Sequence, residues 1–200
     1  MTVTAEQYSK IVDIWCADES IEYVGYDTES NGLDPWVPGS KITSLSVAVS
    51  DDVGYNIFLY HPEIEISEEE RSLIIESTKK LLTTKKVVVH HAKHEHRFAK
   101  VCFGFTPNIV DDTMYMAYIL YMSYPGIRYG LKYLAGRFIS MPPWEEYIDI
   151  YADLFKKMKR YKAIDEKIPG LLEEYKDIGV TEEDLRRFWE ILKDPDYYIK

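Results

Sequence analysis

Two acidic residues separated by one position are the first feature of the chain with chemical content. Asp27, Thr28 and Glu29 follow residues 23–26, an apolar stretch typical of a strand. In a strand, residues i and i+2 point to the same face, so the carboxylates of Asp27 and Glu29 are expected side by side. Paired carboxylates can share hard cations such as Mg²⁺ or Mn²⁺. An ordinary solvated strand end has the same composition, so this motif alone is weak evidence.

Three later segments give the acidic pair a context. An apolar strand at 87–89 is followed by His-His-Ala-Lys-His-Glu at 90–95, an Asp-Asp-Thr-Met segment begins at 111, and Tyr-Gly-Leu-Lys-Tyr-Leu-Ala occupies 129–135. Together with residues 24–34, these segments resemble in order and spacing the motifs of DEDD-superfamily 3′→5′ exonucleases. The resemblance covers about residues 21–140 and is greatest to the proofreading domain of family A DNA polymerases.

The resemblance implies a metal-dependent 3′→5′ exonuclease that removes nucleotides from single-stranded or frayed DNA ends. It implies two Mg²⁺ or Mn²⁺ ions, one activating a water and the other stabilising the departing 3′ oxygen. The implied catalytic and metal-binding residues are Asp27, Glu29 and Glu95. The expected partner is the 3′ end of single-stranded DNA, and a polymerase domain downstream in the same parent chain is a further expectation. The expected substrate-binding residues are Thr28, Leu33, His91 and His94.

Two departures from the family pattern fall in the second segment. Glu95 stands where the family usually has Asp, which moves the carboxylate by one methylene but keeps its charge. His91 replaces the usual Asn, and His94 replaces the usual aromatic residue. Imidazole can donate hydrogen bonds or stack, so these histidines can replace the family's contacts to the single-stranded end.

The third family motif, Tyr-x-x-x-Asp, has no clear copy. Tyr161 and Asp165 fit the spacing, but Pro169-Gly170 is expected to interrupt the helix that should continue from them. Two alternatives stay open. The motif begins near residues 197–198, with its aspartate beyond Lys200, or the chain lacks it.

The hydrophobic periodicity predicts the elements that position these residues. A helix is expected over 5–17, followed by an antiparallel meander of strands at 23–29, 42–49 and 55–60. A capping box at Ser67–Glu70 begins the next helix, and Asp112 is expected to cap another. Strands at 87–89 and 109–110 alternate with helices at 92–101 and 113–121, which favours parallel strands. The predicted fold is therefore α/β and RNase H-like: a mixed central sheet, three antiparallel strands then parallel strands, with helices on both sides.

The domain prediction is a single exonuclease-like domain over 1–200. It has a motif-bearing core at about 20–140 and a charged helical tail at 144–200, in which residues 181–192 form a last capped helix. One expectation is that this tail is truncated before the third motif.

Charge and hydropathy restrict the function further. The 24 basic and 34 acidic residues give a net charge of −10, which argues against a protein that reads duplex DNA. An enzyme that takes one nucleic-acid end is compatible with this charge, because metal ions supply local positive charge. No apolar run is long enough to span a bilayer and no secretory signal precedes the first helix. A soluble, cytoplasmic protein of a bacterial cell or a virus-infected host cell, without membrane contact, is therefore expected.

Three other interpretations compete with the proofreading exonuclease. A domain that lacks the third motif could be a non-catalytic nucleic-acid-binding or scaffolding module. An RNase D-like ribonuclease is a second alternative, because the shared motifs do not separate DNA from RNA. A zinc site is the third, since four histidines lie within seven residues: His90, His91, His94 and His96. The zinc-protease pattern would require a histidine at position 98, which is Phe98.

Overall fold

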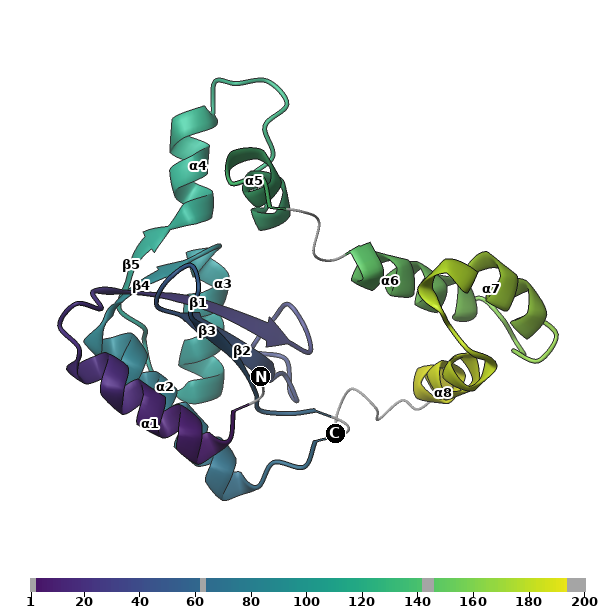
Figure 1. The fold of residues 1–200 in the computed structure, drawn as a ribbon, viewed down its shortest axis with the longest axis horizontal. Coiled ribbons are helices and arrows are strands. Elements are labelled where there is room, and N and C mark those ends of the chain that lie inside the picture. Colours follow the sequence, from purple (N-terminus) through teal and green to yellow (C-terminus); the bar gives the residue numbers. More distant parts are fainter. Residues whose placement is uncertain (1–2, 62–63, 142–145, 194–200) are drawn as a thin grey trace. The chain divides into compact units, whose positions relative to one another are not determined.

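A mixed five-stranded sheet forms the centre of the first part of the chain (Figure 1). Its spatial order is β3-β2-β1-β4-β5. β1 pairs antiparallel with β2 and β2 with β3, whereas β1 pairs parallel with β4 and β4 with β5. This arrangement confirms the predicted antiparallel meander followed by parallel strands. The strands are β1 (Tyr23–Ser30), β2 (Ile42–Ala48), β3 (Gly54–Phe58), β4 (Lys86–Val89) and β5 (Ile109–Asp112).

The structure, a computed structural model, describes residues 3–61, 64–141 and 146–193. The chain divides into two compact units, Met1–Tyr133 and Leu134–Lys200. Each unit has a hydrophobic core of its own. None of the described helices is long and apolar enough to cross a membrane.

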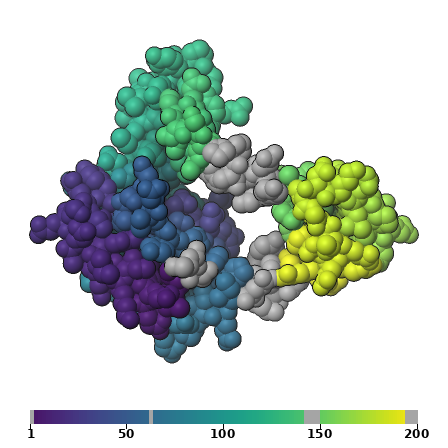
Figure 2. Space-filling view, in the orientation of Figure 1, coloured from purple at the N-terminus to yellow at the C-terminus, as the bar shows by residue number. Residues whose placement is uncertain are grey.

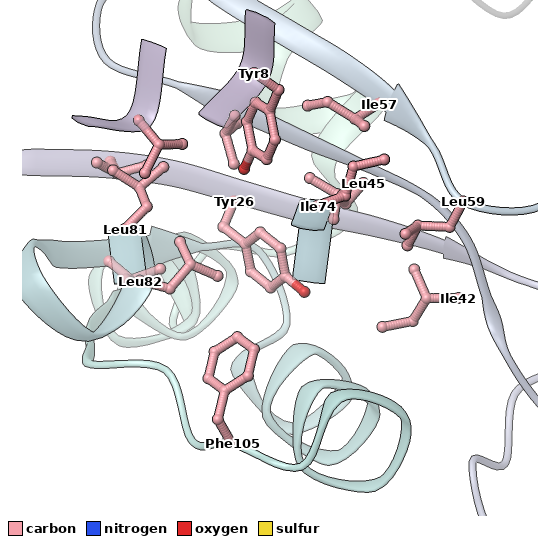
Figure 3. Close-up of a cluster of buried hydrophobic side chains, with 14 of the residues drawn as sticks. Tyr8, Tyr26, Ile42, Leu45, Ile57, Leu59, Ile74, Leu81, Leu82 and Phe105 are labelled. Carbon is pink, nitrogen blue, oxygen red and sulfur yellow. The ribbon is translucent and has the colours of Figure 1, made fainter. Parts of the chain in front are cut away.

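Two long helices, α1 (Ala5–Ala17) and α2 (Glu68–Thr84), pack side by side beneath the sheet (Figure 1). In the space-filling view their purple and blue atoms belong to one continuous surface (Figure 2). Tyr8 of α1 lies at the centre of the core, with its hydroxyl 3.1 Å from the Thr78 hydroxyl of α2. Figure 3 shows Tyr8, Tyr26 of β1, and Leu81 and Leu82 of α2 within this core. Burial of these apolar side chains fixes which face of each strand points inward.

The other face of the sheet carries small and polar side chains and is open. A groove of about 440 Å³ lies over it, bordered by Thr113 of α4 (Thr113–Tyr121) and Leu131 of α5 (Leu131–Phe138). The start of α4 and Leu131 therefore border this second face, and the predicted α/β fold is confirmed. The strand residues that line the groove include Gly25, Asp27, Ser46, Ala48, Gly54, Asn56 and Val88, and His90 lines it directly after β4.

The helix expected over 92–101 has two parts. α3 runs from Ala92 to Phe98 and continues as a π-helical turn, Ala99–Phe103. Gly104 ends the segment with φ +77°, a left-handed conformation that glycine adopts without steric cost.

The second unit contains α6 (Glu146–Met158), α7 (Ile168–Glu174), a 3₁₀ turn (Lys176–Ile178) and α8 (Glu182–Lys193). Its core includes Leu154, Met158, Ile168, Leu171, Leu185 and Trp189. The predicted capped helix over 181–192 is present as α8, and the Thr181 hydroxyl caps it by accepting from the Asp184 N–H at 3.1 Å. The prediction that Pro169-Gly170 interrupts a helix is wrong. α6 ends at Met158, and Pro169 lies in the first turn of α7. Backbone N–H groups in the first turn of a helix make no intrahelical hydrogen bond, so a proline there costs the helix none.

Candidate active site

Asp27 and Glu29 lie on the same face near the carboxyl end of β1. In the register with β2 they stand opposite Ser46 and Ser44. Both carboxylates keep access to solvent, yet the surrounding protein desolvates them in part. Burial raises the pKa of Asp27, and burial followed by the charge of Asp27 raises the pKa of Glu29. The two carboxylates therefore repel each other, as the i, i+2 spacing leads one to expect.

Glu95 reaches the same strand from α3. Its side chain is 2% exposed, and its Oε2 accepts a hydrogen bond of 2.8 Å from the Thr28 hydroxyl. Burial raises the pKa of Glu95 to about 8; hydrogen bonds from Thr28 oppose this rise, and the charges of Asp27 and Glu29 add to it. The three predicted ligands are thus close enough to act on one another electrostatically.

Thr28 bonds to Glu95, a contact that the sequence did not indicate. It points to the covered face of β1, between the two exposed carboxylates, and is 7% exposed. Its described hydrogen bond is to Glu95 rather than to a group on the surface. In the structure Thr28 therefore positions a carboxylate, and its expected contact with substrate stays a prediction.

Asp112 fixes the start of the helix that carries Glu95. It caps α4, as predicted, by accepting from the backbone N–H groups of Met114 and Tyr115 at 2.9 and 3.3 Å. It also accepts from His91 N–H at 3.0 Å and Ala92 N–H at 2.8 Å, at the start of α3. Burial tends to raise the pKa of Asp112, but these four backbone donors outweigh it and lower the pKa. One carboxylate thus joins the first turns of two helices.

The other predicted substrate residues lie around this helix start and the loop after β1. His91 precedes α3 in a left-handed conformation, φ +75°. The His94 ring stacks on the His91 ring, with centroids 6.1 Å apart, and contacts the Phe98 ring in a tilted arrangement, with centroids 4.5 Å apart. Burial, and then the charges of His91 and Arg97, lower the pKa of His94. Leu33 is 87% exposed in the loop that follows β1.

His90 lines the open face together with Asp27 and was not singled out from the sequence. Its Nδ1 lies 2.9 Å from the Thr113 hydroxyl, which donates to the Val89 carbonyl at 3.2 Å. Because that hydroxyl has a single proton, Nδ1 of His90 must be the donor in this pair. The sequence placed His90 only in a histidine-rich segment; its position beside Asp27 depends on the parallel pairing of β1 with β4.

Asp165, the candidate for the third motif, belongs to the second unit. It lies in a turn between α6 and α7, and its Oδ1 pairs with Nη1 of Arg186 at 2.7 Å. The described contact of Asp165 is therefore with α8 of its own unit, and the third motif stays an open prediction.

The predicted ligands suit divalent cations in donor type and charge. Carboxylate oxygens are the ligands that Mg²⁺ and Mn²⁺ prefer. Burial is the main cause of the raised pKa values of Asp27, Glu29 and Glu95, and the negative charge of neighbouring acids adds to it for Glu29 and Glu95, which a bound cation would relieve. Within the described part of the chain, no three His, Cys, Asp or Glu side chains are gathered into a metal-binding group. The carboxylate oxygens are therefore of the right type for these ions. In the structure, however, the Glu95 carboxylate is hydrogen-bonded to the Thr28 hydroxyl.

The sheet order and the acidic strand β1 define an α/β fold of the RNase H-like nuclease class. A sequence model described as 3′–5′ exonuclease matches residues 2–164. The chain belongs to this family, the exonuclease domain found with family A DNA polymerases, and is a 3′→5′ exonuclease hydrolase. No curated protein matches the chain by sequence.

Solved structures with the same fold include both a DNA polymerase and a ribonuclease. The POL domain of Pol1 from M. smegmatis, in complex with DNA primer-template and dNTP, matches with TM-score 0.51 and 17% identity, over 70% of this chain and 22% of that chain. Escherichia coli RNase D, an exoribonuclease involved in structured RNA processing, matches with TM-score 0.51 and 10% identity, over 100% and 44%. A nuclease in its apo form matches with TM-score 0.51 and 15% identity, over 95% and 81%. At these identities the likeness shows the fold alone.

Proposed function

We propose that this chain removes nucleotides from the 3′ ends of single-stranded or frayed DNA, in a reaction that depends on Mg²⁺ or Mn²⁺. The observation that carries the proposal is that Glu95 bonds to Thr28, the residue between Asp27 and Glu29, and that the charges of both acids raise the pKa of Glu95. Mutually repelling carboxylates are costly for a protein that does not use them to bind a cation. A match to the exonuclease family over 2–164 supports the same reaction.

Asp27, Glu29 and Glu95 would hold the ions. When bound, such ions supply a nucleophilic water at neutral pH and neutralise charge on the departing 3′ oxygen. Thr28 orients Glu95 through its hydroxyl, and Asp112 orients the helix from which Glu95 projects. Leu33, in the loop after β1, and His91 and His94, at the start of α3, are proposed to contact the terminal nucleotides. The proposed partners are a single-stranded 3′ end and a polymerase domain in the same parent chain.

Digestion of a single-stranded DNA oligonucleotide labelled at its 5′ end tests the proposal. We expect stepwise shortening from the 3′ end with Mg²⁺ or Mn²⁺, and none with EDTA. The double substitution Asp27→Ala with Glu29→Ala should reduce the rate at least 1,000-fold, on the order of losing several kcal/mol of transition-state stabilisation by the ions. The matched control is Asp51→Ala with Asp52→Ala, two exposed carboxylates in the turn between β2 and β3, which should retain wild-type activity.

A parallel digestion of RNA with the same sequence separates DNA from RNA as substrate. A DNA rate that exceeds the RNA rate supports the proposal, whereas faster RNA digestion supports the RNase D-like alternative, because only RNA offers a 2′-OH for recognition. Binding of either strand without any shortening would support the non-catalytic alternative and would refute the proposed activity.

A further inference from the structure

Three large apolar side chains are exposed within five residues of the loop between β1 and β2. Leu33 is 87% exposed, Trp36 61% and Val37 55%. Single exposed apolar residues are common, but a group of this size that includes a tryptophan is typical of an interaction surface. The loop follows directly from the strand end that carries Asp27 and Glu29.

Hydrogen bonds fix the conformation of this loop. The Asn31 side chain spans its base, donating to the Gly39 carbonyl at 2.9 Å and accepting from Lys41 N–H at 2.8 Å. Pro35 is buried, and Oδ1 of Asp34 accepts from Trp36 N–H at 3.2 Å. Because the backbone on both sides of Trp36 is held, the exposure of its ring is a property of the folded loop.

Arg97 covers one side of the Trp36 ring. Its guanidinium carbon lies 4.4 Å from the ring centroid, and its Nη2 lies 3.4 Å from Oδ1 of Asp34. A guanidinium over an indole is an attractive cation–π contact. Arg97 projects from α3, two residues beyond Glu95, so this contact connects the Trp36 loop to the helix that carries a proposed metal ligand.

We propose that the open side of Trp36 stacks against a base of the single strand that enters the active site. This inference rests on the proposed nuclease function and assigns a substrate contact to it. An indole face accepts any base, because every base presents a flat π surface. Arg97 behind the ring, itself held by Asp34, keeps the indole in place with its other face open.

Equilibrium binding of a ten-nucleotide DNA single strand in EDTA tests the stacking contact, since EDTA prevents metal-dependent cleavage during the titration. Fluorescence anisotropy of a 5′-labelled strand gives Kd, and intrinsic tryptophan emission reports on the ring itself. Trp36→Ala should raise Kd roughly 5- to 100-fold, the range for loss of one base–aromatic stack. Trp36→Phe keeps a stacking ring and should stay within about threefold of wild type.

The matched control is Tyr23→Ala. Tyr23 is also an exposed aromatic residue under a cation, with Nζ of Lys86 5.3 Å from its ring, but it lies at the opposite end of β1. We expect wild-type affinity for this variant.

The emission data give a second, independent outcome. Wild-type fluorescence should be quenched by the strand, whereas Trp36→Phe, which retains three of the four tryptophans, should show little quenching. Quenching that persists in Trp36→Phe, or a Trp36→Ala affinity equal to wild type, overturns the inference. If the circular dichroism spectrum of Trp36→Ala differs from that of wild type, the quenching of wild type and of Trp36→Phe by the strand still tests the stacking contact.

Hydrolysis by the wild-type chain separates this inference from the function on which it rests. Trp36-dependent binding without cleavage in Mg²⁺ would refute the exonuclease proposal and leave the stacking contact supported. Cleavage together with binding that is indifferent to position 36 would refute the stacking contact alone.

Discussion

Replacing Glu95 by Gln should stabilise the metal-free protein and at the same time impair catalysis. Glu95 is buried, and its pKa is raised to about 8 from an ordinary value of 4.5. The folded chain therefore keeps a proton on Glu95 over a pH range in which the unfolded chain has released it. Unfolding then releases a proton between pH 4.5 and 8, so the free energy of unfolding falls as the pH rises through this window.

The size of the effect follows from the width of the window. At 1.36 kcal/mol per pKa unit, the rise in the pKa of Glu95 lowers the free energy of unfolding by about 5 kcal/mol at and above pH 8. Relaxation of the side chain and water penetration reduce such penalties, so about 2–4 kcal/mol is expected. Gln carries no charge, and its amide oxygen can still accept the hydrogen bond from Thr28. Glu95→Gln should thus leave the free energy of unfolding nearly unchanged at pH 4.5 and raise it by about 2–4 kcal/mol at pH 8.

Urea unfolding in EDTA at pH 5 and pH 8, followed by circular dichroism, measures this difference. Glu76→Gln, at an exposed position of α2, is the control and should change stability by less than about 0.5 kcal/mol. The same Glu95→Gln protein should gain less stability than wild type from Mg²⁺ and should degrade single-stranded DNA more slowly. A stability difference that is independent of pH, or that favours wild type at pH 8, would refute the electrostatic reasoning.

Three further substitutions test other contacts of the site. Thr28→Val removes the donor to Glu95 and should cost about 1–3 kcal/mol at pH 8 and less at pH 5, where Glu95 is protonated; an equal cost at both pH values in urea unfolding would contradict this. Asp112→Ala leaves the first turns of two helices without their acceptor and should cost about 1–4 kcal/mol, twice the range for one cap; a loss below about 1 kcal/mol would show that only one cap contributes. His91→Asn places a residue that tolerates φ > 0 at φ +75° and should raise the free energy of unfolding by up to about 1 kcal/mol; a lower thermal midpoint in EDTA would contradict the assigned strain.

Local interactions were the most predictable part of the fold. The capping box at the start of α2 is present as predicted: Ser67 Oγ accepts from Glu70 N–H at 3.1 Å, and Glu70 Oε2 accepts from Ser67 N–H at 2.8 Å. Both partners lie within three residues, so the sequence contains the whole interaction. Pro169-Gly170 is the local pattern that was wrongly interpreted. A proline ends a helix when it would stand in the interior but is compatible with the first turn, where Pro169 lies in α7.

Interactions between distant segments could be predicted only in part. The sequence indicated that Asp112 caps the helix that follows it, but its bonds to His91 and Ala92 depend on parallel pairing of β4 with β5. That pairing brings the carboxyl ends of both strands to one edge of the sheet, where both helices begin. The contact of Arg97 with Trp36 likewise joins segments that no periodicity connects.

The composition of the Asp27-Thr28-Glu29 motif has a physical reason that becomes visible only with the third carboxylate in place. Alternation along β1 puts the two acids on the open face and the residue between them on the covered face. Glu95 arrives on that covered side, in surroundings that disfavour its charge, so the middle residue has to be small enough to be buried and has to carry a donor. Threonine meets both requirements, and its β-branched side chain also suits a strand. An apolar residue there would remove the hydroxyl that donates to the buried carboxylate, at a cost of about 1–3 kcal/mol. The three consecutive residues therefore supply two of the proposed ligands directly and position the third across 67 residues of chain.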